Sequence, residues 1–315
     1  MTAAENIHDT SAMNNVRFLW LEITGKCNLL CTHCYADSGP DVDLYGDMAY
    51  EDWARAIDEA AELGCRQVQF IGGEPTMHPR LDDLADHANH RGFQFIEVFT
   101  NATRLGQKLV CCFQRNRVHV ATSFYSDDPA IHEQITRGKG SWQRTVHGIE
   151  TVVAAGLPIR VGVIETERNA GHAPRAIHFL KTLGVNEFRV DRQRGVGRGD
   201  LVHLGGEEER YEELCGQCWR GRLCVTSRGD VFPCVFARAT RLGDVRCGLA
   251  GILQAAMLAE FRRKVRAMHA QAADDCQPYP CPPDGPCDPQ GGCPPTTCTP
   301  NCSPPCAPDA NCQPY

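Results

Sequence analysis

Three cysteines on one short segment have the spacing of a metal site. Cys27, Cys31 and Cys34 stand at C-x3-C-x2-C within "TGKCNLLCTHCY". Three thiolates can hold three irons of a four-iron, four-sulfur cube, which leaves the fourth iron an open coordination site for a chelating molecule. A zinc site would need a fourth ligand, and His33 is the local candidate, in an awkward position between two ligands. The spacing therefore favours an iron-sulfur cluster with one open iron.

A second group of cysteines lies later in the chain. Ten residues separate Cys218 from Gly229, and four residues separate Gly229 from Cys234. Four of the thiols in this region could hold a further four-iron cluster, but the spacing does not select which four. The alternative is a structural zinc ribbon made by Cys215, Cys218, Cys224 and Cys234. The candidate ligands of an auxiliary cluster are Cys215, Cys218, Cys224, Cys234 and Cys247.

Composition narrows the class of protein. The 315 residues carry a formal net charge of -7, which gives no basic footprint for nucleic acid and no polybasic patch for a membrane. The first residues are polar and lack a secretory signal, and no apolar run is long enough to span a bilayer. We therefore expect a cytoplasmic protein without nucleic-acid or membrane partners. In that compartment the nineteen cysteines are better explained as metal ligands than as disulfides.

The elements that would position these residues alternate regularly. Short β-branched or aromatic runs are followed by helical patterns, which predicts a parallel sheet with right-handed crossovers and a partial (β/α)6 barrel. Chemistry in such a barrel lies at the carboxyl ends of the strands. Strands are expected over 16–24, 67–73, 93–101, 119–126, 159–166 and 187–193, and helices over 50–64, 80–92, 107–116, 141–156 and 173–184.

The chain divides into four predicted parts. Residues 1–15 are a disordered N-terminus, 16–199 form the barrel, 200–275 form a small cysteine-rich extension, and 276–315 are a Pro/Cys-rich tail. The extension should contain a hairpin turning at 227–230 and a helix over 250–271. The glycines of 195–199 suggest a flexible exit from the barrel. About one-third of the tail is proline and one-fifth cysteine, so either metal clusters fold it or its thiols remain available to something else.

Two motifs in this order resemble a known family. "CNLLCTHCY" and "GGEP" (residues 72–75), one β/α unit apart, are similar to the signature and the methionine-binding loop of radical S-adenosylmethionine enzymes. The cysteines of the extension resemble a SPASM or twitch-type auxiliary-cluster domain. The resemblance implies a [4Fe-4S] cluster that binds S-adenosylmethionine, at least one auxiliary [4Fe-4S] cluster, and an electron donor such as flavodoxin or ferredoxin.

The resemblance also implies roles for single residues. Gly72 and Gly73 would let the backbone approach the ligand, Glu74 would accept a hydrogen bond from its ammonium group, and Pro75 would fix the loop. Three further residues lie where related enzymes hold the ribose and carboxylate, and two thiols are candidates for returning hydrogen to a substrate radical. The first three are Asn101, Ser123 and Arg189, and the two thiols are Cys112 and Cys247.

Three functions remain open from the sequence. The leading hypothesis is modification of a ribosomally made peptide by cross-linking, thioether formation or epimerisation, because an auxiliary extension accompanies peptide substrates in similar enzymes. The second is an epimerase or dehydrogenase of a small molecule such as an aminoglycoside. The third is a non-catalytic iron-sulfur or zinc-binding electron-transfer protein, against which "GGEP" argues.

Overall fold

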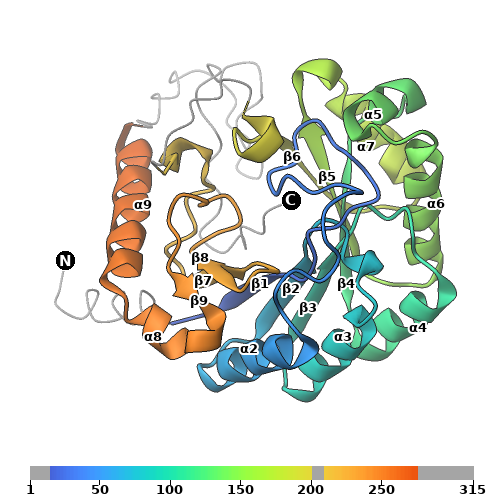
Figure 1. Ribbon diagram of the computed structural model, residues 1–315. Helices are drawn as coiled ribbons and strands as arrows, with labels where there is room; N and C mark the ends of the chain where they lie inside the picture. Colours follow the sequence, from blue (N-terminus) through green and yellow to red (C-terminus); the bar gives the residue numbers. More distant parts are fainter. Residues whose placement is uncertain (1–14, 201–208, 276–315) are drawn as a thin grey trace, which may run out of the picture.

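The structure is a computed structural model that describes residues 15–200 and 209–275, with the side chains of 269–275 left out. The sequence-based predictions for the N-terminus and for the tail at 276–315 fall outside these residues. The described part is an α/β fold in which one sheet curves around a central space, with helices on its outer side (Figure 1). This confirms the predicted fold class of a partial barrel.

Six parallel strands form the barrel wall. They follow each other in space as they do in the sequence, so every crossover joins neighbouring strands. Each strand falls within its predicted segment. The strands are β1 (Phe18–Glu22), β2 (Gln67–Ile71), β3 (Phe95–Phe99), β4 (His119–Phe124), β5 (Ile159–Glu165) and β6 (Glu187–Arg192).

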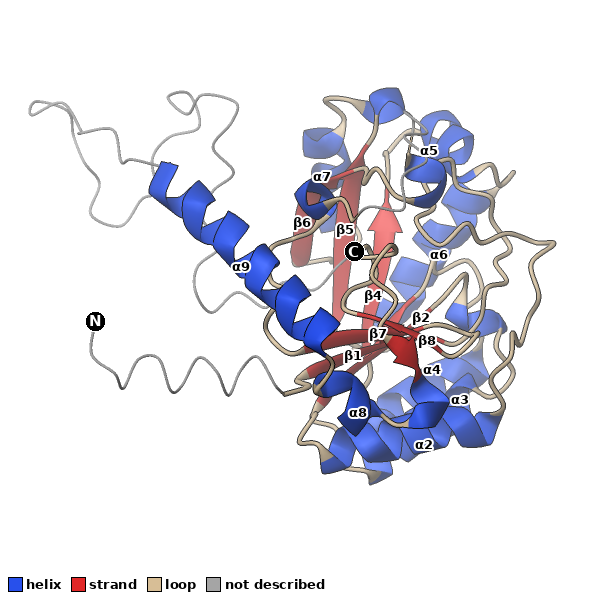
Figure 2. Cartoon of the chain, turned by 60° about the vertical axis from the view of Figure 1, so that its left-hand side comes forward, coloured by secondary structure: helices blue, strands red, loops and turns tan. Residues whose placement is uncertain are grey.

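Helices cover the outer face of this wall (Figure 2). Five of the six were predicted, and the sixth, α5, is a short addition between β4 and α6. Helix α2 is followed by Gly64 at φ +89° and α3 by Gly92 at φ +80°, the left-handed conformation that stops a helix. The helices are α2 (Tyr50–Glu62), α3 (Leu81–His90), α4 (Gln107–Asn116), α5 (Pro129–Thr136), α6 (Ser141–Ala154) and α7 (Ala173–Thr182).

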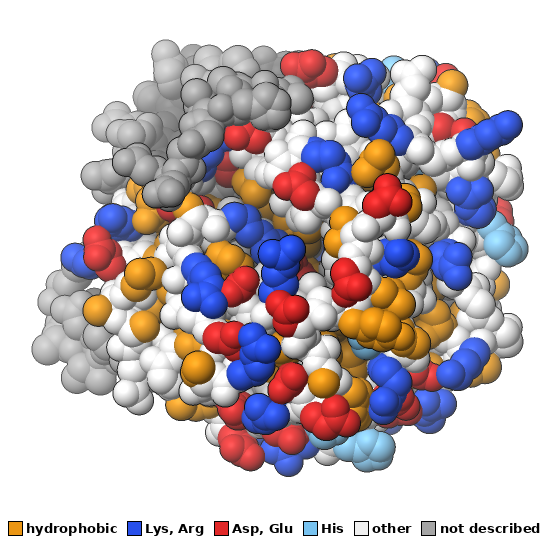
Figure 3. Space-filling view, in the orientation of Figure 1, with side chains coloured by type: hydrophobic (Ala, Val, Ile, Leu, Met, Phe, Trp, Pro, Cys, Tyr) orange, Lys and Arg blue, Asp and Glu red, His pale blue; other side chains and the backbone are white. Residues whose placement is uncertain are grey.

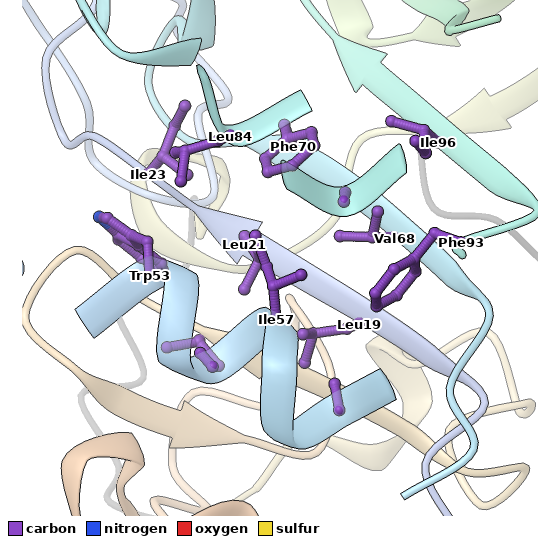
Figure 4. Packing of buried hydrophobic residues seen from close by; sticks show 14 of the residues in the cluster. Leu19, Leu21, Ile23, Trp53, Ile57, Val68, Phe70, Leu84, Phe93 and Ile96 are labelled. Carbon is purple, nitrogen blue, oxygen red and sulfur yellow. The ribbon is translucent and has the colours of Figure 1, made fainter. Parts of the chain in front are cut away.

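Alternation along the strands separates the packed outer layer from the barrel interior. Leu19 and Leu21 of β1 point outward and pack against α2, where Trp53 and Ile57 are fully buried (Figure 4). The intervening side chain of Trp20 belongs to a different buried cluster on the inner side. Burial of the outer layer, at about 25 cal/mol per Å² of apolar surface, holds the helices on the sheet.

A buried polar network lies inside the barrel. Arg160 of β5 donates to both carboxylate oxygens of Glu97 on β3, from Nε at 2.8 Å and Nη2 at 2.7 Å. Gln69 of β2 donates to the same carboxylate. Both charged side chains are almost fully buried, so each depends on the other for compensation. Together, the three side chains join β2, β3 and β5.

The extension continues the barrel sheet. Strand β7 (Arg222–Val225) pairs with β1 in parallel, and β8 (Asp230–Phe232) and β9 (Gly243–Asp244) follow antiparallel. The predicted hairpin is therefore present, but its attachment to the first strand was not foreseen. The single helix expected over 250–271 is two, α8 (Leu249–Leu253) and α9 (Ala256–Asp275).

Short 3-10 turns complete the described elements. These are η1 (Pro75–Met77), η2 (Glu167–Asn169), η3 (Gly197–Gly199), η4 (Tyr211–Glu213) and η5 (Val245–Cys247). Among the described residues, no helix combines the length and the apolar character needed to cross a bilayer.

Candidate metal centre

Cys27, Cys31 and Cys34 line one cavity at the carboxyl ends of the strands. The same cavity is lined by Gly72 and Gly73 from the loop after β2, by Asn101 from the loop after β3, and by Ser123 near the end of strand β4. These loops are brought together because all six strands of the barrel run parallel and end at the same edge. The sequence therefore identified the residues that converge here, with the exceptions described below.

The cysteine loop is fixed by backbone hydrogen bonds from one side. Leu30 N donates to Thr136 O at 3.1 Å and Thr32 N to Ile135 O at 2.9 Å, both at the end of α5. Cys27 N donates to Gly39 O at 3.1 Å, which closes the loop on itself. The unpredicted helix α5 thus supports the segment that carries the three thiols.

The 195–199 segment holds the loop from the other side. Arg198 donates from its backbone N to Cys34 O at 3.0 Å and from Nη2 to Ser38 O at 2.7 Å. Gly197 has φ +58°, and a side chain there would clash with the carbonyl oxygens of Cys34 and Tyr35. The sequence suggested a flexible exit, whereas the structure shows η3 packed on the cysteine loop. The glycines of 195–199 were the available signal in the sequence. They indicate a close approach of this segment to the backbone of the cysteine loop, and not flexibility.

The glycines of "GGEP" serve loop-to-loop packing. Gly73 N donates to Thr24 O at 2.7 Å, and Glu74 N to Lys26 O at 2.8 Å. A Cβ on Gly72 would clash with Thr24 O, and one on Gly73 with Lys26 O. The missing side chains therefore admit the cysteine segment itself, while the same two residues also line the cavity.

The Glu74 side chain lies behind the cavity wall. Its carboxylate is fully buried and accepts hydrogen bonds from Thr76 N and Oγ1, at 3.0 and 2.6 Å, from Thr100 Oγ1 at 2.5 Å and from Asn101 N at 2.7 Å. Burial raises the pKa of this carboxyl group, although these donors oppose the shift. Neither Glu74 nor Pro75 lines the cavity. Instead of the ligand contact expected from sequence, the geometry gives Glu74 the task of joining the loops after β2 and β3.

The three expected polar residues differ in position. Asn101 lines the cavity with its Nδ2 at 3.8 Å from Cys27 Sγ and 2.9 Å from Asn28 Oδ1. Ser123 lines it beside Tyr125. Arg189 does not line the cavity. It is exposed on β6, two residues before Asp191. Asp191, Arg192, Gln193 and Arg194 line the cavity in its place, and none of these four was among the candidate residues expected from the sequence.

The thiols and their polar neighbours suit a cationic cluster. Burial, followed by the nearby Glu74 charge, raises the pKa of Cys27 to about 12, and burial also raises the pKa of Cys31. Thiolates at these positions therefore need a strong positive charge beside them, which iron supplies. His33 Nδ1 and Ser38 Oγ are buried at the cavity without a hydrogen-bond partner in the structure. The donor set and these polar atoms fit an iron-sulfur cluster with a polar ligand.

The second group of cysteines separates into three sets. Cys218 hydrogen-bonds with both Cys215 and Cys234, so these three thiols meet. Cys224 is buried nearby, but its thiol hydrogen-bonds with Glu22. Arg238 completes this arrangement by pairing with Glu22, with Nη1 at 3.2 Å from Oε2.

Cys247 lies apart from these thiols. It is exposed in η5, next to α2. Within residues 15–200 and 209–275, no three side chains of the Cys, His, Asp or Glu types are grouped as one metal ion requires. The zinc ribbon of the four candidate cysteines stays an untested alternative, and Cys224 bonds with Glu22 instead of the other three thiols.

The two candidate hydrogen-donor thiols lie away from the cavity. Cys112 is buried in the layer between helices and sheet, with Sγ facing Asp82 O at 3.8 Å. Cys247 is exposed, and neither thiol lines the cavity. Because Cys112 lies in α4 and Cys247 in η5, away from the cavity, their positions argue against either thiol donating a hydrogen atom to a substrate radical in this site. The helical pattern around Cys112 does not indicate whether its side chain faces the cavity or the layer between helices and sheet.

The cysteine loop and the extension share an aromatic wall. Tyr35, next to Cys34, packs edge-on against Phe236, with ring centroids 5.3 Å apart. Both rings line the cavity, and Phe236 belongs to the buried cluster that contains Cys218 and Cys234. The second thiol group therefore lies directly behind one wall of the cavity.

Two family models match the chain. The first, described as the radical SAM superfamily, matches residues 21–179, which hold the cysteine loop and "GGEP". The second, described as an iron-sulfur cluster-binding domain and named SPASM, matches residues 215–282. The two matches correspond to the barrel and to the extension that continues its sheet.

Two curated relatives are similar along most of the chain. The "Antilisterial bacteriocin subtilosin biosynthesis protein AlbA" of Bacillus subtilis is 24% identical over 71% of this chain, which spans 56% of that protein. The "PqqA peptide cyclase" of Streptomyces rochei is 27% identical over 70% of this chain, which spans 69% of that protein. The chain thus spans little more than half of the first relative's length.

Solved structures share the fold. SuiB of Streptococcus suis, in its structure bound to precursor peptide SuiA, superposes with a TM-score of 0.65 at 14% identity. The match covers 84% of this chain and 69% of that one. At this identity the likeness concerns the fold alone.

Proposed function

The chain belongs to the radical SAM superfamily, and from this premise we propose that it cleaves S-adenosylmethionine reductively and uses the resulting radical to modify a ribosomally made peptide. The observation that carries the proposal is the convergence of Cys27, Cys31 and Cys34 on one cavity whose walls include Gly72 and Gly73. A [4Fe-4S] cluster on the three thiols, with S-adenosylmethionine on its open iron, would supply a 5′-deoxyadenosyl radical that abstracts hydrogen.

The residues of this chain orient the cofactor and keep water out. Arg198 and the end of α5 fix the cysteine loop, and Asn101 approaches Cys27 from the loop after β3. We infer that Asn101, Ser123 and the backbone of Gly72 and Gly73 contact the bound S-adenosylmethionine, since all four line the cavity. The half-buried ring of Tyr35 and the buried ring of Phe236 close one side, which protects a radical from solvent.

The extension supports an auxiliary [4Fe-4S] cluster. We propose Cys215, Cys218 and Cys234 as ligands, because these thiols meet behind the cavity wall. At least one further ligand would come from outside this set. We do not include Cys224 or Cys247, because the first bonds with Glu22 and the second is exposed elsewhere. A flavodoxin or ferredoxin type of protein would deliver the electron that starts each turnover.

A peptide is the best supported substrate class. The names of two relatives refer to a bacteriocin and to a peptide cyclase, and the SuiB structure contains a precursor peptide. The cavity also shares Arg192 and Gln193 with an open cleft at the ends of β5 and β6, which gives an extended chain a way in. Cross-linking, thioether formation and epimerisation are the reactions to be distinguished.

The test is mass spectrometry of a short peptide encoded beside this gene. The peptide is co-expressed with the protein in deuterated water, with the Cys27→Ala, Cys31→Ala, Cys34→Ala variant as control, and 5′-deoxyadenosine is measured with the purified protein. Loss of hydrogens from the peptide is the expected sign of cross-linking, and deuterium on an α-carbon that of epimerisation. An unchanged peptide with release of 5′-deoxyadenosine would favour a small molecule, and a protein that never binds S-adenosylmethionine would be a non-catalytic one.

A further inference from the structure

We propose that the cysteine-rich segment 283–315 of this chain is itself a substrate of the cavity, in which its cysteines form thioether bonds to α-carbons of the same segment. The inference rests on the proposed radical chemistry and names its peptide. Three observations support it: the number of thiols that the clusters require, the place where the described chain ends, and the chemistry of the segment.

The chain contains more cysteines than its iron-sulfur clusters require as ligands. The SPASM match ends at residue 282 and already contains seven cysteines, of which a four-iron cluster needs at most four. Three of these, Cys215, Cys218 and Cys234, meet in the structure. Six more lie beyond the match, at Cys287, Cys293, Cys298, Cys302, Cys306 and Cys312. No ligand requirement of the two matched domains accounts for all six.

The described chain leads to this segment from the wall of the cavity. Helix α9 packs through Phe261 and Val265 on the buried cluster that also contains Phe236, which lines the cavity. An extended chain covers about 3.3 Å per residue, so the 37 residues from Asp275 to Cys312 can span roughly 120 Å. A body of this size has a radius of gyration of about 18 Å. Tethering at this distance gives an effective concentration on the order of millimolar, well above that of a separate peptide.

The composition of the segment suits a thioether precursor. It contains three aspartates and no lysine or arginine, while the cavity lining contains Arg192, Arg194 and Arg198. Arg192 pairs with Glu213 and Arg194 with Asp191, so Arg198 is the arginine of this lining that is best placed for an aspartate of the segment. Proline is its commonest residue.

The reaction balances with components already named. One electron from the donor and S-adenosylmethionine give methionine and the 5′-deoxyadenosyl radical, which takes a hydrogen atom from an α-carbon of the segment and becomes 5′-deoxyadenosine. The sulfur of a cysteine then bonds to that α-carbon, its proton is released to solvent, and the one remaining electron passes to the auxiliary iron-sulfur cluster. Each bridge therefore removes two hydrogens from the segment and returns the electron that was supplied.

The test uses the full chain and its own proteolysis. No lysine or arginine follows Arg266, so trypsin releases residues 267–315 as one peptide with all eight tail cysteines. The protein is reconstituted without oxygen, incubated with S-adenosylmethionine and dithionite, fully reduced, alkylated and digested. Each thioether bridge should lower the mass of the peptide itself by two hydrogens. Each bridge should also reduce by one the number of thiols that are alkylated. A disulfide cannot imitate this, because reduction restores both of its thiols.

Two variants separate the possible results. Cys27→Ala provides the unmodified mass, and replacement of the six cysteines from Cys287 to Cys312 by serine should keep the iron content and 5′-deoxyadenosine release while abolishing the mass change. Release of 5′-deoxyadenosine with an unmodified 267–315 peptide would overturn this inference and leave the proposed function standing. Absence of 5′-deoxyadenosine would overturn both. In a third experiment, the active protein is mixed with a ¹⁵N-labelled Cys27→Ala chain. Equal modification of the two tails would show that the reaction occurs between chains, and would overturn the proposal that each chain modifies its own segment.

Discussion

Arg198 and Cys31 are 167 residues apart in the sequence and are joined by a hydrogen bond of 2.9 Å from Nε to the carbonyl oxygen. The bond links the segment after β6 to the middle of the cysteine loop. Because hydrogen bonds to charged donors are stronger than neutral ones, this single side chain is a principal support of the loop. The site therefore depends on the last barrel strand although all three thiols follow the first.

Replacement of Arg198 by glutamine should loosen the cysteine loop. Two charge-assisted hydrogen bonds, each contributing roughly 1.5–3 kcal/mol, are lost from the loop backbone. We expect the reconstituted protein to retain less iron and to bind S-adenosylmethionine at least tenfold more weakly. Iron analysis and equilibrium binding measure this, with Arg175→Gln, a change at an exposed ion pair, as the control. Full iron content and unchanged affinity in R198Q would contradict the role of Arg198.

Gly73→Ala should displace the "GGEP" loop. The new methyl group would clash with the backbone of Lys26, which cannot move without moving Cys27. Gly92→Ala is the matched control, because its φ of +80° adds backbone strain of about 1 kcal/mol but nothing lies within 4 Å of its Cβ. Both variants should lose some stability in urea unfolding. Only G73A should also lose affinity for S-adenosylmethionine, and equal affinities would show that the loop packing is irrelevant to the site.

Cys218→Ser and Cys224→Ser should differ in iron content. Cys218 meets two other thiols, whereas Cys224 bonds with the Glu22 carboxylate, which in turn pairs with Arg238. We expect C218S to lose up to one whole cluster, about four irons, and C224S to keep its iron while unfolding at lower denaturant concentration. Iron and sulfide analysis together with electron paramagnetic resonance decide the matter. Loss of the auxiliary signal in C224S would place Cys224 among the ligands.

The Glu97–Arg160 pair should show strong coupling. Arg160→Met leaves a buried carboxylate without its partner, which costs about 3–5 kcal/mol of the free energy of unfolding. The double variant Glu97→Leu, Arg160→Met removes both charges and should be more stable than R160M alone. Urea unfolding of the four proteins gives the coupling free energy. Additive losses would mean that the two side chains act independently.

His132 should make stability depend on mildly acidic pH. Burial between Phe124 and Tyr125 lowers its pKa from 6.5 to about 3, so the unfolded chain binds the proton first as the pH falls. The contribution is present above pH 6.5 and is lost progressively below it, by about 2 kcal/mol at pH 5. His132→Phe should lose less stability than the parent between pH 7.5 and 5, and His90→Gln, at an exposed position, should behave as the parent does. Identical pH dependence in all three proteins would refute this.

The local pattern of the sequence predicts most of the barrel and the first metal site. Strand and helix periods place all six parallel strands, and C-x3-C-x2-C with "GGEP" identifies residues that the fold brings to one cavity. Both signals are short in range, since each depends on residues within one loop or one element. That is why they can be read without knowing the tertiary structure.

The positions that the sequence did not predict depend on how segments distant in the sequence pack against one another. Arg189 and Asp191 are two residues apart on β6, yet only Asp191 reaches the cavity, and the sequence does not say how far each strand extends. Cys112 looked available because the pattern does not show which side of the sheet its helix covers. The division of the second cysteines, with Cys224 turned to Glu22, likewise depends on the pairing of β7 with β1, which no local pattern predicts.

The pairing of β7 with β1 also orders events during synthesis. Translation delivers β1 about 200 residues before its second neighbour, so an N-terminal barrel strand leaves the ribosome with one edge open. An open edge is prone to wrong pairing until it is covered. The open edge of β1 is therefore covered only after β7 has been synthesised, and Cys215 and Cys218 precede β7 in the chain. A chain stalled before residue 225 would expose β1 to aggregation, and chaperone binding at that stage would follow from the topology itself.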